Sequence, residues 1–193
     1  MNKTFLKKII LLASGSGSNV ENIIKHFDEN LMIEVVLVAG NNPNAGVFHR
    51  IKPYNIDTLV FDKLFFNEEF IKIVDQKNVD LIILAGFLWK IPESLIERYP
   101  NKIINIHPSL LPKYGGKGMF GDNVHKAVIN NNEKKTGISI HIVNEEYDKG
   151  RIIFQTEIPI KYNDSAESIA KKIKKLEKKY FPIVIEKYLL NIK

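Results

Sequence analysis

Residues 9–19 read I-I-L-L-A-S-G-S-G-S-N, and this stretch decides the fold. Five apolar residues in a row, with no polar residue between them, are typical of a strand that is buried on both faces of a parallel sheet. The serine- and glycine-rich turn then ends the strand, and Ser18 or Asn19 can cap a following helix. The stretch therefore predicts the strand, turn and helix that open an α/β fold.

The same alternation continues along the chain. Because successive strands are separated by helices, the sheet is predicted to be parallel and right-handed in its connections, with helices on both faces. The last two strands have no helix between them, so they should form an antiparallel edge near the C-terminus. We found no linker or repeat and expect residues 1–193 to form a single domain with a Rossmann-like sheet. Strands are expected at 9–13, 33–39, 58–61, 80–84, 102–106, 137–143 and 151–159, and helices at 18–27, 45–54, 67–76 (capped by Asn67), 92–98, 124–130 and 165–190.

Composition narrows the class of protein. The chain has no cysteine, which excludes disulfides, thiolate zinc sites and a cysteine nucleophile, and which fits a reducing cytoplasm. The net charge is +6, but only three of the 28 basic residues are arginine, the residue that best reads phosphate and guanine. No apolar run approaches the ~18 residues of a membrane span, and no histidine has metal-ligand spacing. We therefore expect a cytoplasmic protein without nucleic acid, membrane or metal.

The turn at residues 14–19 has two interpretations. Glycines allow a tight turn, and the free N–H groups at a helix N-terminus attract anions, so the turn suits a phosphate group. A dinucleotide fingerprint is absent, because Val20 stands where its third glycine would be. An ordinary strand-to-helix turn explains the same residues equally well.

Polar residues also end a later strand. Asn105 and His107 lie two residues apart, so their side chains should share one face at the carboxyl end, where open α/β sheets bind ligands. An amide donor beside an imidazole suits acyl transfer, and the carboxylate of Asp148 could orient that imidazole. Alternatively, Asn105 is a cap, His107 is half-buried, and Asp148 is a solvated turn residue. Trp89 could likewise line a pocket or belong to the core.

Four stretches together resemble the folate-dependent formyltransferases, most closely those that act on glycinamide ribonucleotide in purine biosynthesis. The resemblance implies formyl transfer from 10-formyltetrahydrofolate to the amine of glycinamide ribonucleotide, giving formylglycinamide ribonucleotide and tetrahydrofolate without a metal. The stretches are S-G-S-G-S-N at 14–19, L-A-G-F-L-W-K-I at 84–91, I-N-I-H-P-S-L-L-P-K-Y at 104–114 and N-E-E-Y-D-K-G at 144–150.

The resemblance also implies a role for particular residues. Asn105 would stabilise the oxyanion, His107 would be the general acid/base, and Asp148 would orient the imidazole and raise its pKa. The ribonucleotide and its phosphate would contact Gly17, Ser18, Asn19, Lys174 and Glu177. Folate would contact Leu88, Trp89, Lys90, Ile91, Asn105, Asn144, Glu145, Glu146, Tyr147 and Asp148.

Two departures and several alternatives remain. Some relatives hold folate with an arginine for which the nearest position here is Asn67, and the loop at 112–122 carries four glycines that could make it a lid. Methionyl-tRNA formyltransferase would need an extra RNA-binding domain, and formyltetrahydrofolate hydrolase usually carries a regulatory one; we expect neither domain. A sugar-nucleotide formyltransferase, a formyltetrahydrofolate hydrolase or a non-catalytic nucleotide-binding module stays open as an alternative, as does the choice between monomer and homodimer.

Overall fold

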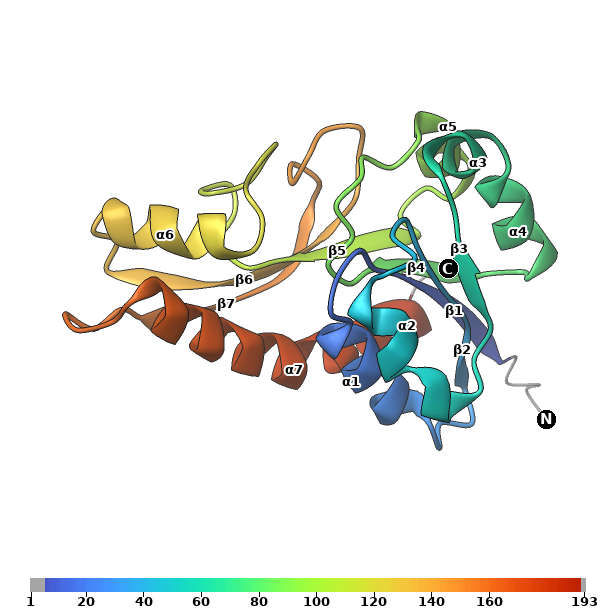
Figure 1. The fold of residues 1–193 in the computed structure, drawn as a ribbon, viewed down its shortest axis with the longest axis horizontal. Helices are drawn as coiled ribbons and strands as arrows, with labels where there is room; N and C mark the ends of the chain where they lie inside the picture. The colour runs from blue at the N-terminus through green and yellow to red at the C-terminus, as the bar shows by residue number, and fades with distance from the viewer. Residues whose placement is uncertain (1–5, 192–193) are drawn as a thin grey trace.

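Strand β1 (Lys7–Leu12) is an interior strand of a seven-stranded sheet, in a computed structural model that describes residues 6–191 (Figure 1). Its alternate side chains enter two different cores. Ile9 and Leu11 pack on one face of the sheet, and Ile10 and Leu12 pack on the other, all of them fully buried. The uninterrupted apolar run is therefore explained by a strand that is covered on both faces, as predicted.

The sheet has the strand order β3-β2-β1-β4-β5-β6-β7. Strands β1 to β5 are parallel, β6 is antiparallel to β5, and β7 is antiparallel to β6. The mixed sheet with an antiparallel C-terminal edge is thus confirmed. The remaining strands are β2 (Ile33–Gly40), β3 (Thr58–Val60), β4 (Leu81–Leu84), β5 (Ile103–His107), β6 (Lys135–Ile142) and β7 (Ile152–Pro159).

Helices cover both faces of the sheet (Figure 1). The long α7 (Ala166–Asn191) packs against α1 (Ser18–Phe27) and α6 (Asp122–Asn130), and its Ile173 and Ile185 join the core that contains Ile9. The opposite core takes side chains from α3 (Lys63–Glu68), α4 (Phe70–Gln76) and α5 (Glu93–Arg98). A short α2 (Gly46–Arg50) is followed by a 3₁₀ helix (Lys52–Tyr54). Within residues 6–191, no helix is long and apolar enough to cross a membrane.

One predicted helix boundary was wrong. The helix expected at 67–76 begins earlier, at Lys63, because the carboxylate of Asp62 accepts a hydrogen bond from the Phe65 N–H at 2.8 Å and caps it. Asn67 therefore lies inside α3 and is not a cap. The backbone breaks at Glu69, and α4 then continues with Phe70. The helical region that follows the edge strand β3 therefore begins with Lys63 rather than with Asn67.

The order of the strands creates a crevice. From β1 the chain proceeds outward through β2 and β3, and it then returns to place β4 and β5 on the other side of β1. Such a reversal separates the loops that follow β1 and β4, and ligands of open α/β sheets bind at this point, outside the carboxyl ends of the strands. The serine- and glycine-rich turn follows β1, and Asn105 and His107 end β5, so the fold brings both to one crevice.

Candidate active site

A cavity of about 520 Å³ occupies this crevice. Its walls come from segments far apart in the sequence, which meet because the strands that precede them end at the same edge of the sheet. The cavity is lined by residues 15–19, 84–91, 105–108, 116–121 and 143–148 (except 145), by His125 and His141, and by Ile173, Lys174 and Glu177 of α7.

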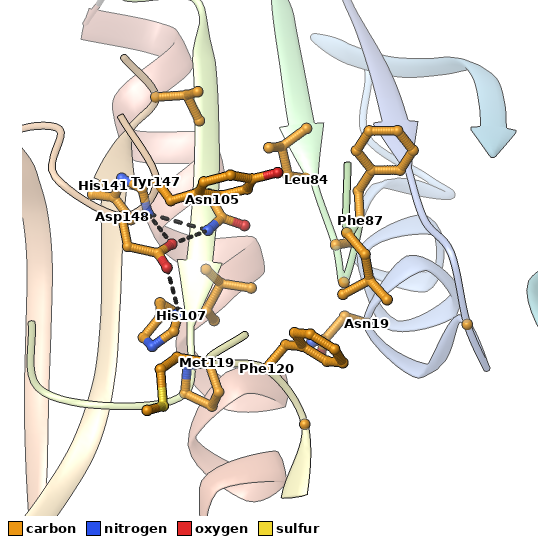
Figure 2. Close-up of a pocket in the computed structure, with 18 of the residues that line it drawn as sticks. Asn19, Leu84, Phe87, Asn105, His107, Met119, Phe120, His141, Tyr147 and Asp148 are labelled. Carbon is orange, nitrogen blue, oxygen red and sulfur yellow. Dashed lines mark hydrogen bonds and ion pairs between the residues drawn. The ribbon is translucent and has the colours of Figure 1, made fainter. Parts of the chain in front are cut away.

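Asn105, His107 and Asp148 meet at one wall of the cavity (Figure 2). The amide nitrogen of Asn105 lies 3.3 Å from Oδ1 of Asp148, and Nδ1 of His107 lies 3.5 Å from Oδ2 of the same carboxylate. Asp148 reaches this place from a loop whose backbone adopts a φ of 57° at that residue, in the left-handed region. The three residues predicted from a strand end and a distant loop are therefore neighbours.

The hydrogen bonds of His107 define which ring nitrogen carries a proton. Nε2 lies 2.7 Å from the backbone oxygen of Tyr114, which can only accept, so Nε2 donates. The proton that distinguishes the neutral ring from the cation is then on Nδ1, which faces Asp148. Burial lowers the pKa of His107 below its ordinary value, although the Asp148 carboxylate and the Tyr114 carbonyl raise it. The expectation that Asp148 raises this pKa holds for its own contribution, but burial outweighs it.

Asp148 is held in its ionised form. Burial alone would raise the pKa of its carboxyl group, but the His141 ring 3.5 Å away, the charge of His107 and the Gly116 N–H outweigh burial and lower it. The Gly116 N–H donates to Oδ2 at 2.9 Å. Asp148 can therefore stabilise a positive charge on either neighbouring imidazole at neutral pH.

His141 is a member of this cluster that the sequence did not single out. Its Nε2 lies 3.1 Å from the Asn105 amide nitrogen and 3.5 Å from Oδ1 of Asp148. The reason is register, since β6 pairs with β5 so that His141 stands opposite Asn105. The alternation Ile138-Ser139-Ile140-His141 places Ser139 and His141 on one face of β6, and this period of two could have revealed the residue.

The amide of Asn105 is oriented by its partners. Nδ1 of His141 lies 3.0 Å from the backbone oxygen of Ile142 and so carries a hydrogen, which leaves Nε2 of the neutral ring as an acceptor. The two N–H groups of Asn105 then point to His141 and Asp148. The amide oxygen is the group left for the cavity. An N–H of Asn105 becomes free for a ligand only when one of these two contacts is given up.

The turn after β1 suits an anion. Gly17 precedes α1 with a φ of 73° and makes no side-chain cap, so the first N–H groups of the helix stay free of such a cap. A Cβ at this position would lie 2.5 Å from Val47, which explains the glycine. Asn19 donates to Oε2 of Glu177 at 3.0 Å, and Lys174 lies on the same stretch of α7. Burial raises the pKa of Glu177, opposed by Asn19 and Lys174.

A second part of the cavity is more apolar. Of the residues for which the resemblance implies folate contact, those that line the cavity here are Leu88, Trp89, Lys90, Ile91, Asn144, Glu146 and Tyr147, whereas Glu145 does not line it. Trp89 satisfies both alternatives considered for it, because it lines the cavity and also packs near Phe66 and Phe87. The ammonium group of Lys63 lies 4.9 Å from the Trp89 ring, which places a cation beside this wall.

The glycine-rich loop forms the remaining wall. Gly116, Gly118 and Gly121 have positive φ angles, and Met119 and Phe120 between them line the cavity close to Asn19 and His107 (Figure 2). Phe120 is still 49% exposed. The loop is hydrogen-bonded to His107 through the Tyr114 carbonyl and to Asp148 through the Gly116 N–H.

Comparisons with known proteins agree with this geometry. Residues 7–185 match the formyl transferase family. The chain is 37% identical over 191 residues to a phosphoribosylglycinamide formyltransferase of Bacillus subtilis, covering 95% of each, and 37% identical over 187 residues to a chloroplastic one of Arabidopsis thaliana, covering 93% of this chain and 64% of that protein.

Solved structures of proteins with the same name have a similar fold. The structure of a phosphoribosylglycinamide formyltransferase from Bacillus halodurans superposes with a TM-score of 0.87 at 32% identity and covers 97% of both chains. That of the protein from Anaplasma phagocytophilum has a TM-score of 0.86 at 32% identity, covering 96% of this chain and 88% of that one. Because the family match extends over most of its length, this chain belongs to the formyl transferase family of enzymes.

Proposed function

We propose that this enzyme transfers the formyl group of 10-formyltetrahydrofolate to the amine of glycinamide ribonucleotide. The observation that carries the proposal is the convergence of Asn105 and His107 on Asp148, at 3.3 and 3.5 Å, in a cavity that the N-terminus of α1 also lines. One end of that cavity suits a phosphate and the other suits a flat ring system. Relatives that share most of this chain carry the name of this activity.

The ribonucleotide is assigned to the end of the cavity that α1 and α7 form. Its phosphate would accept hydrogen bonds from the N–H groups of Gly17, Ser18 and Asn19, at the positive end of the helix dipole. Lys174 adds a positive charge to this region, and Glu177 offers an acceptor for hydroxyl groups. This placement leaves the substrate's amine directed along the cavity toward Asn105.

The folate is assigned to the apolar end. A flat heterocycle can lie between Leu88, Ile91 and the loop that contains Tyr147, whose backbone can bond its polar edge. The acidic tail of a folate needs a positively charged side chain at the opening of the cavity. Asn67 cannot supply it, but Lys63 beside Trp89 can, and it stands where the helix begins rather than where the sequence suggested.

The chain's own groups then account for the chemistry. The reaction forms a carbon–nitrogen bond to the substrate amine, breaks the bond to the folate nitrogen, and moves one proton from the first nitrogen to the second. His107 exchanges that proton through Nδ1, and the ionised Asp148 stabilises the resulting imidazolium. Negative charge on the formyl oxygen needs a donor, which is the role assigned to Asn105.

The orientation of Asn105 adds a condition to this role. Its two N–H groups are engaged, one of them with Nε2 of neutral His141. When His141 is protonated at Nε2, that nitrogen becomes a donor toward Asp148 and no longer accepts from Asn105. A proton on His141 therefore frees an amide N–H for the oxyanion.

A spectrophotometric assay of tetrahydrofolate formation, with and without glycinamide ribonucleotide, tests the proposed function. We expect product only when both substrates are present. Turnover without the ribonucleotide would indicate a hydrolase. Turnover only with an amino-sugar nucleotide would indicate a sugar-nucleotide formyltransferase, and binding without turnover would indicate a nucleotide-binding module.

A further inference from the structure

We propose that Glu133, which does not line the cavity, is a positioning residue for His107 and acts through Lys113 and Tyr114. The inference rests on the catalytic role proposed above for His107. Glu133 would fix how the His107 ring is held and which of its two ring nitrogens exchanges a proton. None of Glu133, Lys113 and Tyr114 lines the cavity.

The contact that holds His107 comes from a backbone in an uncommon conformation. The carbonyl of Tyr114 accepts from Nε2 of His107 at 2.7 Å, and Tyr114 has a φ of 58°. Residues with a Cβ rarely adopt this left-handed region, because the Cβ approaches the following carbonyl oxygen. Something other than local preference must keep Tyr114 in place.

Glu133 provides that restraint. Its Oε1 accepts a hydrogen bond from the Tyr114 hydroxyl at 2.9 Å and another from the ammonium group of Lys113 at 2.8 Å. Glu133 lies just after the end of α6, whereas Tyr114 lies before its beginning, so the contacts span the helix. Two consecutive residues of the loop thus meet one carboxylate oxygen.

The preceding residues are fixed in another way. The hydroxyl of Ser109 donates to the Lys113 carbonyl at 2.7 Å, and the buried hydroxyl of Ser139 donates to the Ser109 carbonyl at 2.7 Å. After Tyr114 the chain continues with Gly115 and Gly116, which restrain the backbone least. Tyr114 is therefore the position at which a rigid segment meets a pliable one, and its side chain is held by Glu133.

The restraint has a chemical consequence for His107. While the Tyr114 carbonyl is in place, Nε2 keeps its hydrogen and the exchangeable proton belongs to Nδ1, which faces Asp148. Without Glu133 the Tyr114 backbone can leave the left-handed region and the carbonyl turns away. The neutral ring then loses its preference for the Nε2–H tautomer, and a group that raises its pKa is removed.

The test compares Glu133→Ala, Tyr114→Phe and Glu133→Gln, which keeps an oxygen acceptor, with the wild-type enzyme. Lys135→Met is the matched control. It breaks the exposed ion pair between Lys135 of β6 and Glu157 of β7, whose N–O distance of 2.7 Å is similar to that of the Lys113–Glu133 pair. Nitrogen-15 NMR of the imidazoles reports the tautomer directly, and loss of signals in a His107→Gln sample assigns them.

We expect the wild-type ring and the Lys135→Met ring to be the Nε2–H tautomer. In Glu133→Ala and Tyr114→Phe both tautomers should appear and the pKa of His107 should fall, while Asp148 and His141 around the ring are unchanged. Glu133→Gln should restore much of the wild-type spectrum. The kcat of Glu133→Ala should fall about tenfold or more, as expected for a misplaced catalytic group, with the KM for the ribonucleotide unaltered.

An unchanged His107 tautomer and pKa in a folded Glu133→Ala protein would overturn the inference. If Glu133→Ala does not fold, as judged by circular dichroism, the same result in Tyr114→Phe overturns it. A changed tautomer with a normal kcat would support the positioning by Glu133 and contradict the catalytic role of His107, so the two proposals fail separately.

Discussion

At the scale of single residues, the chemistry depends on side chains whose partners set their state. His107 is more deeply buried than Asp148, and the carboxylate lies between two imidazoles. Burial favours the neutral ring of His107, whereas the carboxylate favours its cation. These opposing effects suit the general acid/base role proposed for His107.

Asn105→Ala should lower kcat by about 100-fold or more, the usual effect of removing one oxyanion donor, while the KM values for both substrates change little. Steady-state kinetics with both substrates varied checks this prediction. Circular dichroism should show an intact fold, since only a side chain at a strand end is removed. A variant with normal kcat and a raised folate KM would instead assign Asn105 to binding.

At the scale of elements, the turn between β1 and α1 shows how packing and function share one sequence. Ser14 accepts a hydrogen bond from the Leu88 N–H at 3.0 Å and donates to Asn41 at 2.7 Å, so the turn is tied to two neighbouring loops. Gly17 is constrained by φ and by Val47, whereas a Cβ at Gly15 would meet nothing within 4 Å. The two glycines therefore serve different purposes.

Gly17→Ala and Gly15→Ala should separate stability from binding. Gly17→Ala should lower the free energy of unfolding by about 1–3 kcal/mol, because it adds left-handed strain and a clash with Val47. Gly15→Ala should leave the urea midpoint almost unchanged and raise the KM for the ribonucleotide, since its methyl group enters open space beside the assigned phosphate. Equal midpoints for the two variants would contradict this division.

At the scale of the whole molecule, ionised carboxylates link elements that are distant in the sequence. Hydrogen bonds from Arg50 and then Lys25 lower the pKa of Glu21 from 4.5 to about 2, and Arg50 also donates to the Ser16 carbonyl at 2.9 Å. Asp148 likewise has a lowered pKa, whereas that of Glu177 is raised. Carboxyl groups whose pKa is lowered in the folded state stabilise the fold at neutral pH and lose that effect in acid.

The contribution of Glu21 should be complete above pH 4.5 and should disappear as the pH falls to about 2, the pKa of the folded state. Glu21→Gln should therefore be less stable than the wild type at pH 7, with a difference that narrows across this range. Urea unfolding at several pH values measures it. Glu157→Gln, which disrupts an exposed ion pair, is the control and should show only a small difference throughout. A difference for Glu21 that is constant with pH would refute the assignment.

The order of strands and helices, the mixed sheet and the strand-end position of Asn105 and His107 followed from the sequence, because local periodicity and turn residues report burial one element at a time. The meeting of Asp148 with those residues came from a resemblance, and the part of His141 was not foreseen. The alternation in β6 places it on one face with Ser139, but its place opposite Asn105 depends on the register of β5 against β6, which no local pattern contains.

The sequence by itself determined which segments are strands and helices, and which polar residues stand at their ends. Only the tertiary structure decided that burial outweighs Asp148 at His107 and that the Asn105 amide nitrogen is engaged by its neighbours. The physical reason is the separation along the chain of the groups that determine each property. Secondary structure arises from neighbours along the chain, whereas pKa values and hydrogen-bond partners arise from groups that only the packed fold brings within a few ångströms.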